Sequence, residues 1–340
     1  MNSSSCSTHA PLISFVVMCY NTEAFVAECI ESIRNLRGDY DWEIVAIDDC
    51  SKDGTVSVLE SIRDPRLRIL KNEVNRGPQE AATRALLATR GQFVTRMDSD
   101  DRYRPEFLDS TIPALQNNPR VGLVYGEAEM IDPQGKPCGM ACTPRSGRGD
   151  WSGNELVDLL RNNFICNPTI IGRRECFADS LPVPGHIVLC DWYFNVNTAR
   201  KWDFYFVDQV LADYRIHPGN FHNRLIADGS QEKTIFWVLD RVFASTEESP
   251  AIEAAKRERR GELYGSNYWM MAGKYFGHGM YADACRCYKN AVRNDRVYLL
   301  RSELYKRLLG LLMGQRGYEK SKAMMKQLLG RNTGAAEVRS

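Results

Sequence analysis

The sequence predicts an α/β fold, in which a mostly parallel sheet carries helices on both faces, followed by an all-α C-terminal extension. Between residues 11 and 125, apolar runs of strand length alternate with segments whose apolar residues recur at helical spacing. Such alternation is typical of parallel sheets joined by right-handed crossovers. Two of the strand-like runs end in aspartates, at the strand ends where open α/β sheets bind ligands. After residue 230 the apolar spacing is helical throughout.

The elements of the first 125 residues follow from these patterns in order. Short, continuously apolar runs predict strands that are buried in a sheet, and apolar residues every three or four positions predict helices. The predicted strands are Ile13–Met18, Glu43–Ile47, Leu67–Lys71, Phe93–Met97 and Val121–Tyr125, and the predicted helices begin near Val26, Thr55, Gln79 and Pro105.

The following segment, residues 126–165, is rich in Gly, Pro and polar residues. This composition predicts a long connection or flap, and long loops in compact domains are often functional. Beyond it we expect a returning strand at Pro168–Ile171 and a helix that begins at Asp191. Two further strands are expected at Phe204–Val207 and Gln209–Ile216.

The C-terminal region combines helical spacing with positive charge. Small and aromatic residues between Tyr268 and Ala291 predict a helical hairpin that resembles a tetratricopeptide repeat. A second pair is expected near Val297–Met313 and Tyr318–Leu329. Residues 251–340 carry 18 Lys and Arg against 8 Asp and Glu, which leaves 26 against 35 for residues 1–250. This region is either a helical extension packed on the first domain, a partner-docking surface, or a peripheral contact with anionic lipid.

Composition indicates a protein of a reducing compartment. The eleven cysteines are scattered, and no two pairs have the spacing of zinc ligands, so we expect reduced thiols. The N-terminus lacks the apolar core of a signal peptide, and no apolar run approaches the roughly 18 residues that span a bilayer. We expect a cytoplasmic location, with the basic C-terminal region as a candidate for contact with the inner face of the membrane, and no nucleic-acid partner.

The strongest functional signal is the acidic cluster Asp98, Asp100 and Asp101 after the fourth strand. Three carboxylates this close repel one another unless a cation lies among them, and Mg²⁺ or Mn²⁺ prefers oxygen ligands. Capping of the next helix is the alternative. A second acidic turn, Asp48 and Asp49, follows the second strand, and capping explains two such turns less well than a shared site does.

Six pieces of the chain, in order, resemble family 2 glycosyltransferases of the GT-A fold over residues 11–220. They are Tyr20-Asn21, Val45–Thr55, Asn75-Arg76-Gly77, Arg96–Asp101, Cys190-Asp191 and Tyr214–Asn220. The resemblance implies an inverting enzyme that uses a nucleotide-diphosphate sugar, with Mg²⁺ or Mn²⁺ as cofactor. No glycine-rich phosphate loop is present, which agrees with a metal-bound diphosphate.

The resemblance also implies roles for individual residues. An aromatic ring can stack on a flat base, and a carboxylate can accept hydrogen bonds from the N–H edge of a uracil-type base, for which we favour Asp49. Asp98 is expected to face the ribose. Arg215 is either a diphosphate anchor or an inward salt-bridge partner, and Asp101 either supports the metal site or caps a helix. The expected nucleotide-sugar contacts are Tyr20, Asn21, Asp48, Asp49, Arg76, Asp98 and Arg215, and the expected metal ligands are Asp100 and His217.

Inversion requires a general base that takes the proton of the acceptor hydroxyl as the new bond forms. The family places this base in a Glu-Asp pair at the start of a late helix. Here the pair is Cys190-Asp191, so the glutamate is missing and Asp191 is the expected base. The same residue could also serve as the helix N-cap.

We therefore predict transfer of a sugar from a nucleotide-diphosphate sugar, for which we favour a UDP-sugar, to a saccharide or lipid-linked saccharide hydroxyl in polysaccharide or glycoconjugate synthesis. The alternatives are a nucleotidyltransferase and a non-catalytic nucleotide-binding scaffold with a helical docking module. The expected organisation is a disordered tail at residues 1–10, a glycosyltransferase domain at 11–230 and a helical region at 231–340. Within that domain, residues 11–125 form the nucleotide-binding half and residues 126–230 form the acceptor half.

Overall fold

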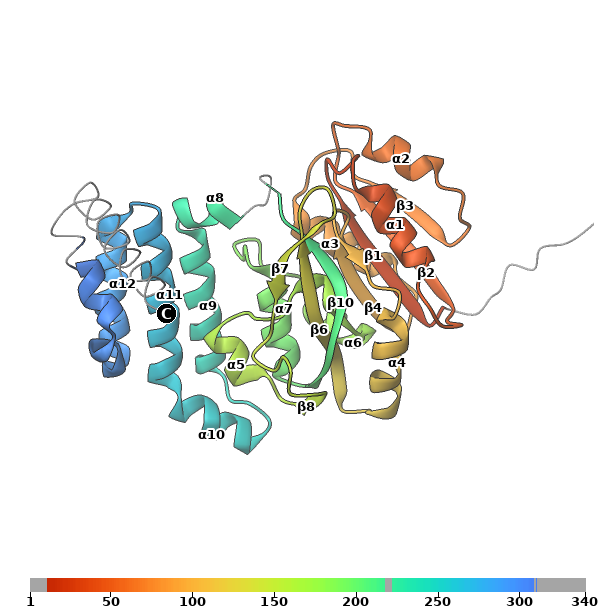
Figure 1. The fold of residues 1–340 in the computed structure, drawn as a ribbon. Helices are drawn as coiled ribbons and strands as arrows, with labels where there is room; N and C mark the ends of the chain where they lie inside the picture. Colours follow the sequence, from red (N-terminus) through yellow and green to blue (C-terminus); the bar gives the residue numbers. More distant parts are fainter. Residues whose placement is uncertain (1–10, 218–221, 309, 311–340) are drawn as a thin grey trace, which may run out of the picture. The chain divides into compact units, whose positions relative to one another are not determined.

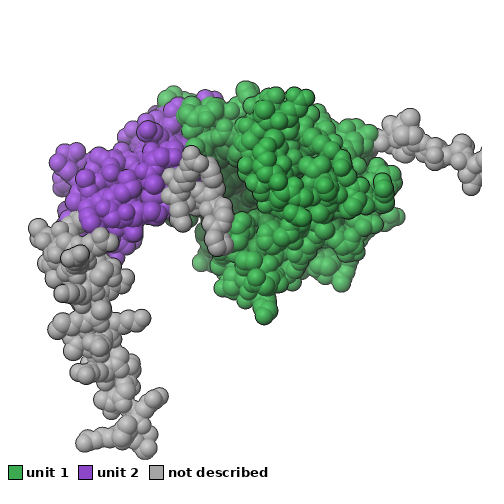
Figure 2. Space-filling model, turned by 90° about the horizontal axis from the view of Figure 1, so that it is seen from above, with its two compact units in different colours: residues 1–221, 244–255 green, residues 222–243, 256–340 purple. Residues whose placement is uncertain are grey.

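The computed structural model describes residues 11–217, 222–308 and 310 (Figure 1). The chain forms two compact units, which are coloured separately in Figure 2. Unit 1 comprises residues 1–221 and 244–255, and unit 2 comprises residues 222–243 and 256–340. The boundary predicted between residues 230 and 231 falls within unit 2, and the predicted tail at residues 1–10 lies outside the described residues.

The first half of unit 1 has the predicted alternation of strands and helices. Its strands lie side by side in the order β3-β2-β1-β4, and all three pairings are parallel. The predicted strands and helices are confirmed, with ends that differ by a few residues. The strands are β1 (Ile13–Cys19), β2 (Trp42–Asp48), β3 (Leu67–Lys71) and β4 (Phe93–Asp98), and the helices are α1 (Val26–Arg34), α2 (Thr55–Ser61), α3 (Pro78–Ala88) and α4 (Phe107–Asn117).

The register of these strands brings the acidic turns to one edge. Cys19 at the end of β1 pairs with Asp48 of β2, and Met18 pairs with Asp98 of β4. Parallel strands share their carboxyl-end edge, so the turns that follow β1, β2 and β4 lie next to one another.

The second half of unit 1 extends the same sheet. The complete order is β3-β2-β1-β4-β9-β6-β10-β5, with β7 paired to β6 and β8 paired to β10. Strand β9 is antiparallel to both of its neighbours, whereas β6 and β10 are parallel. The elements are β5 (Arg102–Tyr103), β6 (Val121–Ile131), β7 (Pro137–Ala141), β8 (Trp151–Gly153), α5 (Leu156–Arg161), η1 (Asn167–Thr169), β9 (Ile171–Arg173), α6 (Arg174–Asp179), α7 (Cys190–Ala199) and β10 (Asp203–Arg215).

The predicted flap at residues 126–165 is wrong. Strand β6 continues to Ile131, and β7, β8 and α5 follow. Two buried acids fix this segment: Glu127 accepts hydrogen bonds from the backbone N–H and hydroxyl of Thr143, and Glu155 pairs with Arg145. Polar residues that are satisfied internally look like loop residues in a sequence, because burial is not visible there.

Two further elements differ from expectation. The strand predicted at Pro168–Ile171 is a 3₁₀ turn, η1, followed by β9, since Pro168 has no N–H for a strand ladder. The two strands predicted at 204–216 form a single strand, β10, whose register shifts between Val207 and Val210. Such a bulge interrupts the alternation of side chains within one continuous strand.

Helices cover both faces of the sheet (Figure 1). On one face, α1 and α4 pack on Phe15, Val17 and Met97. On the other face, α3 and α6 pack on Val16 and Val94. The side chains of β4 therefore alternate between two cores, and Arg96 and Asp98 belong to the face that α3 covers.

Unit 2 is helical, as predicted. The expected hairpin is α11 (Arg260–Gly277) followed by α12 (Tyr281–Asn294), with Tyr275, Ala284 and Ala291 buried. The other elements are α8 (His222–Ala227), α9 (Ser230–Ala244), α10 (Pro250–Glu258), whose first residues belong to unit 1, and η2 (Arg296–Leu300). Residues 302–308 are helical, and the helix predicted at Tyr318–Leu329 lies outside the described residues. No helix within the described ranges is long and apolar enough to span a membrane.

Candidate active site

The turn after β4 is fixed to the end of β1. The Ser99 N–H donates to the carbonyl of Met18, and the Ser99 hydroxyl lies 2.6 Å from that of Thr22. Asp101 is buried and accepts the backbone N–H of Arg215 at 2.8 Å. Helix α4 begins only at Phe107, so Asp101 supports the turn and is not a helix cap.

Asp100 and His217, the two expected metal ligands, are in direct contact. His217 Nε2 lies 2.8 Å from Asp100 Oδ2, and its ring stacks on Phe25 at 5.9 Å between centroids. A carboxylate oxygen and an imidazole nitrogen suit Mn²⁺, and the carboxylate suits Mg²⁺. Among the described residues no group of three or more His, Cys, Asp or Glu could hold a metal ion. A cation bound here would therefore take much of its coordination from diphosphate oxygens and water, as Mg²⁺ does at substrate phosphates.

Arg215 takes the second of its two expected roles, that of an inward salt-bridge partner. Its side chain is 2% exposed. The guanidinium donates to the carbonyls of Asp100, Asp132 and Pro133 at 2.7, 3.1 and 3.2 Å and pairs with Glu28 at 2.7 Å. It thus ties the end of β10 to the turn that follows β4, to the β6–β7 turn and to α1.

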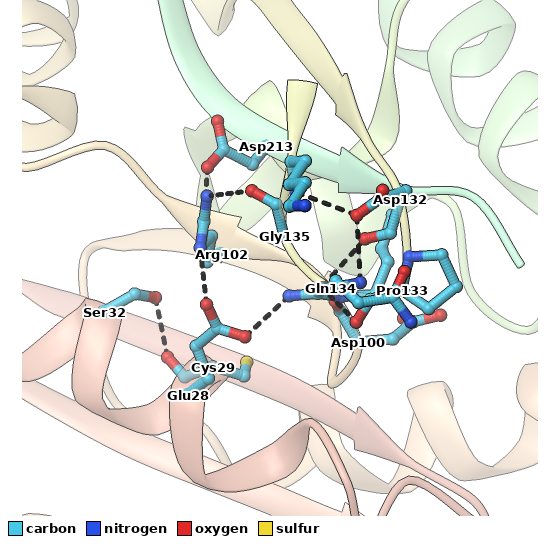
Figure 3. Close-up of polar contacts among 12 residues, drawn as sticks. Glu28, Cys29, Ser32, Asp100, Arg102, Asp132, Pro133, Gln134, Gly135 and Asp213 are labelled. Atoms are coloured by element: carbon cyan, nitrogen blue, oxygen red, sulfur yellow. Dashed lines mark hydrogen bonds and ion pairs between the residues drawn. The ribbon is translucent and has the colours of Figure 1, made fainter. Parts of the chain in front are cut away.

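A second arginine completes this support (Figure 3). Arg102 bridges Asp213 of β10 and Glu28 of α1, and it donates to the carbonyl of Gly135 at 3.3 Å. The β6–β7 turn is therefore held from two sides. Proline 218, glycine 219 and asparagine 220 of the last motif lie outside the described residues.

The two acids after β2 are both buried but differ in their contacts. Asp49 accepts hydrogen bonds from the backbone N–H groups of Arg76 and Gly77 and from the amide of Asn72, at 2.8–2.9 Å. Asp48 accepts the N–H of Ser51, while its Oδ1 has no hydrogen-bond partner among the described residues. A carboxylate has about four acceptor sites, so both acids retain capacity for a ligand.

The remaining expected nucleotide contacts are Tyr20 and Asn21, which follow β1, and Arg76, whose backbone contacts Asp49. Tyr20 is 48% exposed, as a base-stacking ring requires. Asn21 has a positive φ of 53° and accepts the N–H of Lys52 at 2.7 Å, so it shapes the turn after β1. The side chain of Arg76 pairs with Glu80, whereas its backbone N–H binds Asp49.

Asp191 lies in the first turn of α7 and is not its N-cap, which is Leu189. Its Oδ2 accepts a hydrogen bond from the Asn163 side-chain amide at 3.0 Å. Asp191 also lines a pocket of ≈ 540 Å³, part of which is open solvent. Sequence reasoning did not find Asn163, because a lone asparagine in a polar segment carries no signal.

The acids of the site influence one another. Asp98 reaches the surface, yet the protein that surrounds it raises its pKa; the charge of Arg96 opposes this shift, and Asp100 and Asp191 add to it. Burial raises the pKa of Asp101 well above its ordinary value, with Asp100 and Asp98 adding to the shift. The carboxylates from β4 and α7 thus lie within electrostatic reach of one another and form one negatively charged site.

Known proteins show the same sequence pattern. The sequence model of the family described as Glycosyl transferase family 2 matches residues 14–179 of this chain. An uncharacterized glycosyltransferase of Haemophilus influenzae is 30% identical over 218 residues, which cover 62% of this chain and 67% of that protein. The chain belongs to glycosyltransferase family 2. This glycosyltransferase is also 30% identical over 212 residues to TuaG of Bacillus subtilis, whose name places it in teichuronic acid biosynthesis; the match covers 61% of this chain and 79% of TuaG.

A further relative shares a shorter segment. The succinoglycan biosynthesis protein ExoO of Rhizobium meliloti is 39% identical over 98 residues, or 29% of this chain and 28% of that protein. The names of the relatives support a glycosyltransferase of polysaccharide synthesis.

Solved structures confirm the fold of this glycosyltransferase. Staphylococcus aureus TarS 1-349 in complex with UDP-GlcNAc has a TM-score of 0.55 at 16% identity, covering 84% of this chain and 91% of that one. The mannosyltransferase PcManGT of Pyrobaculum calidifontis, in complex with GDP-Man and Mn²⁺, has a TM-score of 0.57 at 16% identity, covering 98% and 89%. The predicted GT-A-type fold is therefore confirmed.

Proposed function

We propose that this glycosyltransferase moves a sugar from a UDP-sugar to an acceptor hydroxyl with inversion at the anomeric carbon. The observation that carries the proposal is the meeting of acids from β2 and β4 at one sheet edge, with Asp191 within electrostatic reach of Asp98. Such an edge suits a nucleotide-diphosphate, and a nearby carboxylate suits an acceptor that must lose a proton.

Asp100 and His217 are the residues that would hold Mg²⁺ or Mn²⁺. Their contact at 2.8 Å and their donor atoms support this assignment, as does the Mn²⁺ in the PcManGT complex. A bound divalent ion neutralises the negative charge that develops on a departing diphosphate. Arg215 would position the Asp100 backbone, because its Nε donates to the Asp100 carbonyl.

Asp191 is the proposed general base. The acceptor oxygen attacks the anomeric carbon from the face opposite the diphosphate, and Asp191 takes the hydroxyl proton as the new C–O bond forms. The bond to the diphosphate breaks, and its electron pair leaves with the phosphate oxygen. The amide of Asn163 orients the Asp191 carboxylate without neutralising its charge.

The nucleoside would lie over the turns that follow β1 and β2. Tyr20 offers an exposed ring for stacking, and Asp48 and Asp49 offer acceptors for a base N–H. Asp98 would face the ribose. The UDP-GlcNAc bound by TarS supports a uridine nucleotide.

The test measures binding and product together. Purified protein is titrated with UDP and GDP, with Mn²⁺ or with EDTA, and is then incubated with UDP-sugars. We expect Mn²⁺-dependent UDP binding and slow release of UDP. Release of pyrophosphate would favour nucleotidyl transfer, and binding without any turnover would favour the scaffold alternative.

We further propose that unit 2 contacts an anionic membrane near a lipid-linked acceptor. Arg293, Arg296 and Arg301 are exposed beside Leu300, which is 84% exposed. Basic residues around exposed apolar side chains are typical of interfacial contacts. Full-length protein should co-sediment with phosphatidylserine vesicles more than with phosphatidylcholine vesicles, and Leu300→Asp should reduce this; equal sedimentation would contradict the idea.

A further inference from the structure

The pocket beside Asp191 has a mostly apolar wall that contains two charged residues. It lies on the α3 face of the sheet and is lined by residues of α3, α6 and α7. The pocket is partly open to solvent, and the ≈ 540 Å³ of empty space within it includes that open part. Most of the wall is apolar, formed by Leu86, Ile170, Phe177, Leu181, Val183 and Phe194.

Among the residues that line the pocket, two are charged: Arg96 and Asp191. Arg96 lies on β4, two residues before Asp98, so both side chains belong to the same face of the strand. Arg96 Nε is shielded from water and has no hydrogen-bond acceptor among the described residues. The Arg96 guanidinium also forms no ion pair with any described residue. A buried donor without an acceptor is unfavourable, so this N–H is available to a ligand in the pocket, while the charge of Arg96 also acts on Asp98.

The ligand that best matches a guanidinium is an anion with two acceptor oxygens. Arginine binds carboxylates through two parallel N–H bonds, a geometry that a hydroxyl cannot reproduce. The donor diphosphate is expected elsewhere, at the Asp100–His217 pair beyond the end of β4. The apolar part of the wall suits the C–H face of a sugar ring.

We propose that this pocket binds a sugar that carries a carboxylate, a hexuronic acid, with the carboxylate on Arg96 and the ring against the apolar wall. The proposal rests on the proposed glycosyl transfer and names the class of its substrate. Arg96 then determines specificity for an acidic sugar, and Asp191 lies in the same pocket as the proposed base. The carboxylate belongs to either the donor or the acceptor.

The donor arm of the test uses calorimetric titration of the full chain with Mn²⁺. The ligands are UDP-glucuronic acid, UDP-galacturonic acid, the two corresponding neutral UDP-hexoses and UDP. We expect an acidic donor to bind roughly 10–100-fold more tightly than its neutral counterpart, the range of a charge-assisted hydrogen bond. Arg96→Gln should remove this preference and leave UDP affinity unchanged, and Arg96→Lys should retain part of it.

The acceptor arm uses methyl glucuronide and methyl glucoside, each titrated in the presence of UDP and Mn²⁺. A carboxylate preference in this arm alone assigns the acidic sugar to the acceptor. The matched control is Arg63→Gln, an exposed arginine of the same unit, which should change neither arm. Circular dichroism and melting temperature show that each variant is folded.

Two results overturn the proposal. One is the absence of a carboxylate preference in both arms. The other is an equal loss of affinity for UDP itself in Arg96→Gln, which would assign the arginine to the diphosphate. If neutral UDP-sugars are still turned over, glycosyl transfer stands and only the acidic specificity fails. If no nucleotide sugar binds at all, both proposals fail.

Discussion

Carboxylates at the two ends of the central strands differ in how many hydrogen-bond and ion-pair partners they have. At the amino end, Glu43 of β2 accepts hydrogen bonds from the Ser14 hydroxyl and from the backbone and side chain of Arg90, and it also pairs with Arg68. At the carboxyl end, Asp48 has one oxygen without a hydrogen-bond partner in the described part of the chain, and Asp100 contacts a histidine. In the same sheet, Glu43 therefore has partners for both of its carboxylate oxygens, whereas the acids at the carboxyl end retain acceptor capacity.

The pKa shifts express this difference. Burial alone would raise the pKa of Glu43, but the hydrogen bonds from Ser14 and Arg90 and the charge of Arg68 outweigh it and lower the pKa. The surrounding protein and the charges of Asp100 and Asp191 raise the pKa of Asp98 instead, against the opposing charge of Arg96. A structural carboxylate thus has its counter-charge within the chain, whereas the acids of a ligand site depend on what binds there.

Replacement of the proposed base should have the largest effect. Asp191→Asn keeps the size of the side chain but cannot take a proton, so we expect transfer to fall by about 10²–10⁴-fold. UDP affinity with Mn²⁺ should stay nearly unchanged. Steady-state kinetics and calorimetry measure the two quantities, and the exposed Asp39→Asn serves as control. Wild-type turnover of Asp191→Asn would remove the base assignment.

Replacement of the proposed metal ligand tests the carboxyl end directly. Asp100→Ala should weaken Mn²⁺-dependent UDP binding by at least about 10–100-fold, the loss seen when even an outer partner of a metal site is removed. The melting temperature of the ligand-free protein should change little, because Asp100 is not part of the core. Unchanged Mn²⁺-dependent titration by UDP would show that the acid is not a ligand.

Replacement of Glu43 should give the opposite pattern. Its pKa is lowered in the folded state, so its stabilisation is present above the unfolded pKa of about 4.3 and is lost as the pH falls through the folded pKa. Glu43→Gln should lower the free energy of unfolding by about 1.5–3 kcal/mol at pH 7, and the difference should shrink below about pH 4.

Urea unfolding at pH 7 and at pH 3 measures the loss of unfolding free energy in Glu43→Gln. The UDP affinity of this variant should not change. Glu31→Gln, at a residue whose side chain is 54% exposed, is the matched control and should stay within about 0.5 kcal/mol. A difference for Glu43→Gln that persists undiminished at pH 3 would contradict an ionic role.

The smallest effect is expected at Asn163. Removal of one neutral hydrogen bond costs about 0.5–1.5 kcal/mol, so Asn163→Ala should reduce kcat by roughly three- to tenfold with little change in the KM of the donor. An equal loss in UDP affinity would mean that the residue supports the nucleotide side instead. This variant measures how much orientation an uncharged partner gives to the base.

The strands that carry the acids of the candidate site were predicted well from the sequence, because their signals are local. Strand β3 has the predicted bounds, and each acid of β2 and β4 follows directly on its apolar run. The pairing of Asp100 with His217 was predicted by resemblance, since 117 residues separate the two side chains.

The acceptor side was harder to predict, because its determinants are internal. Glu127 and Glu155 look like loop residues but are buried. The bulge near Asp208 divided β10 into two apparent strands. The role of Arg96 depends on what surrounds it, and spacing along the chain carries no information about the pocket wall.

The salt bridge between Arg215 and Glu28 joins residues that are 187 positions apart in the chain. This separation has a consequence for synthesis on the ribosome. A nascent chain that ends before residue 215 already contains every acid of β2 and β4, but it lacks Arg215, which ties the turn at Asp100 to α1. Contacts of such long range form late, because closing a long loop is entropically unfavourable. Donor binding should therefore be acquired in one late step of folding, after β10 has been translated.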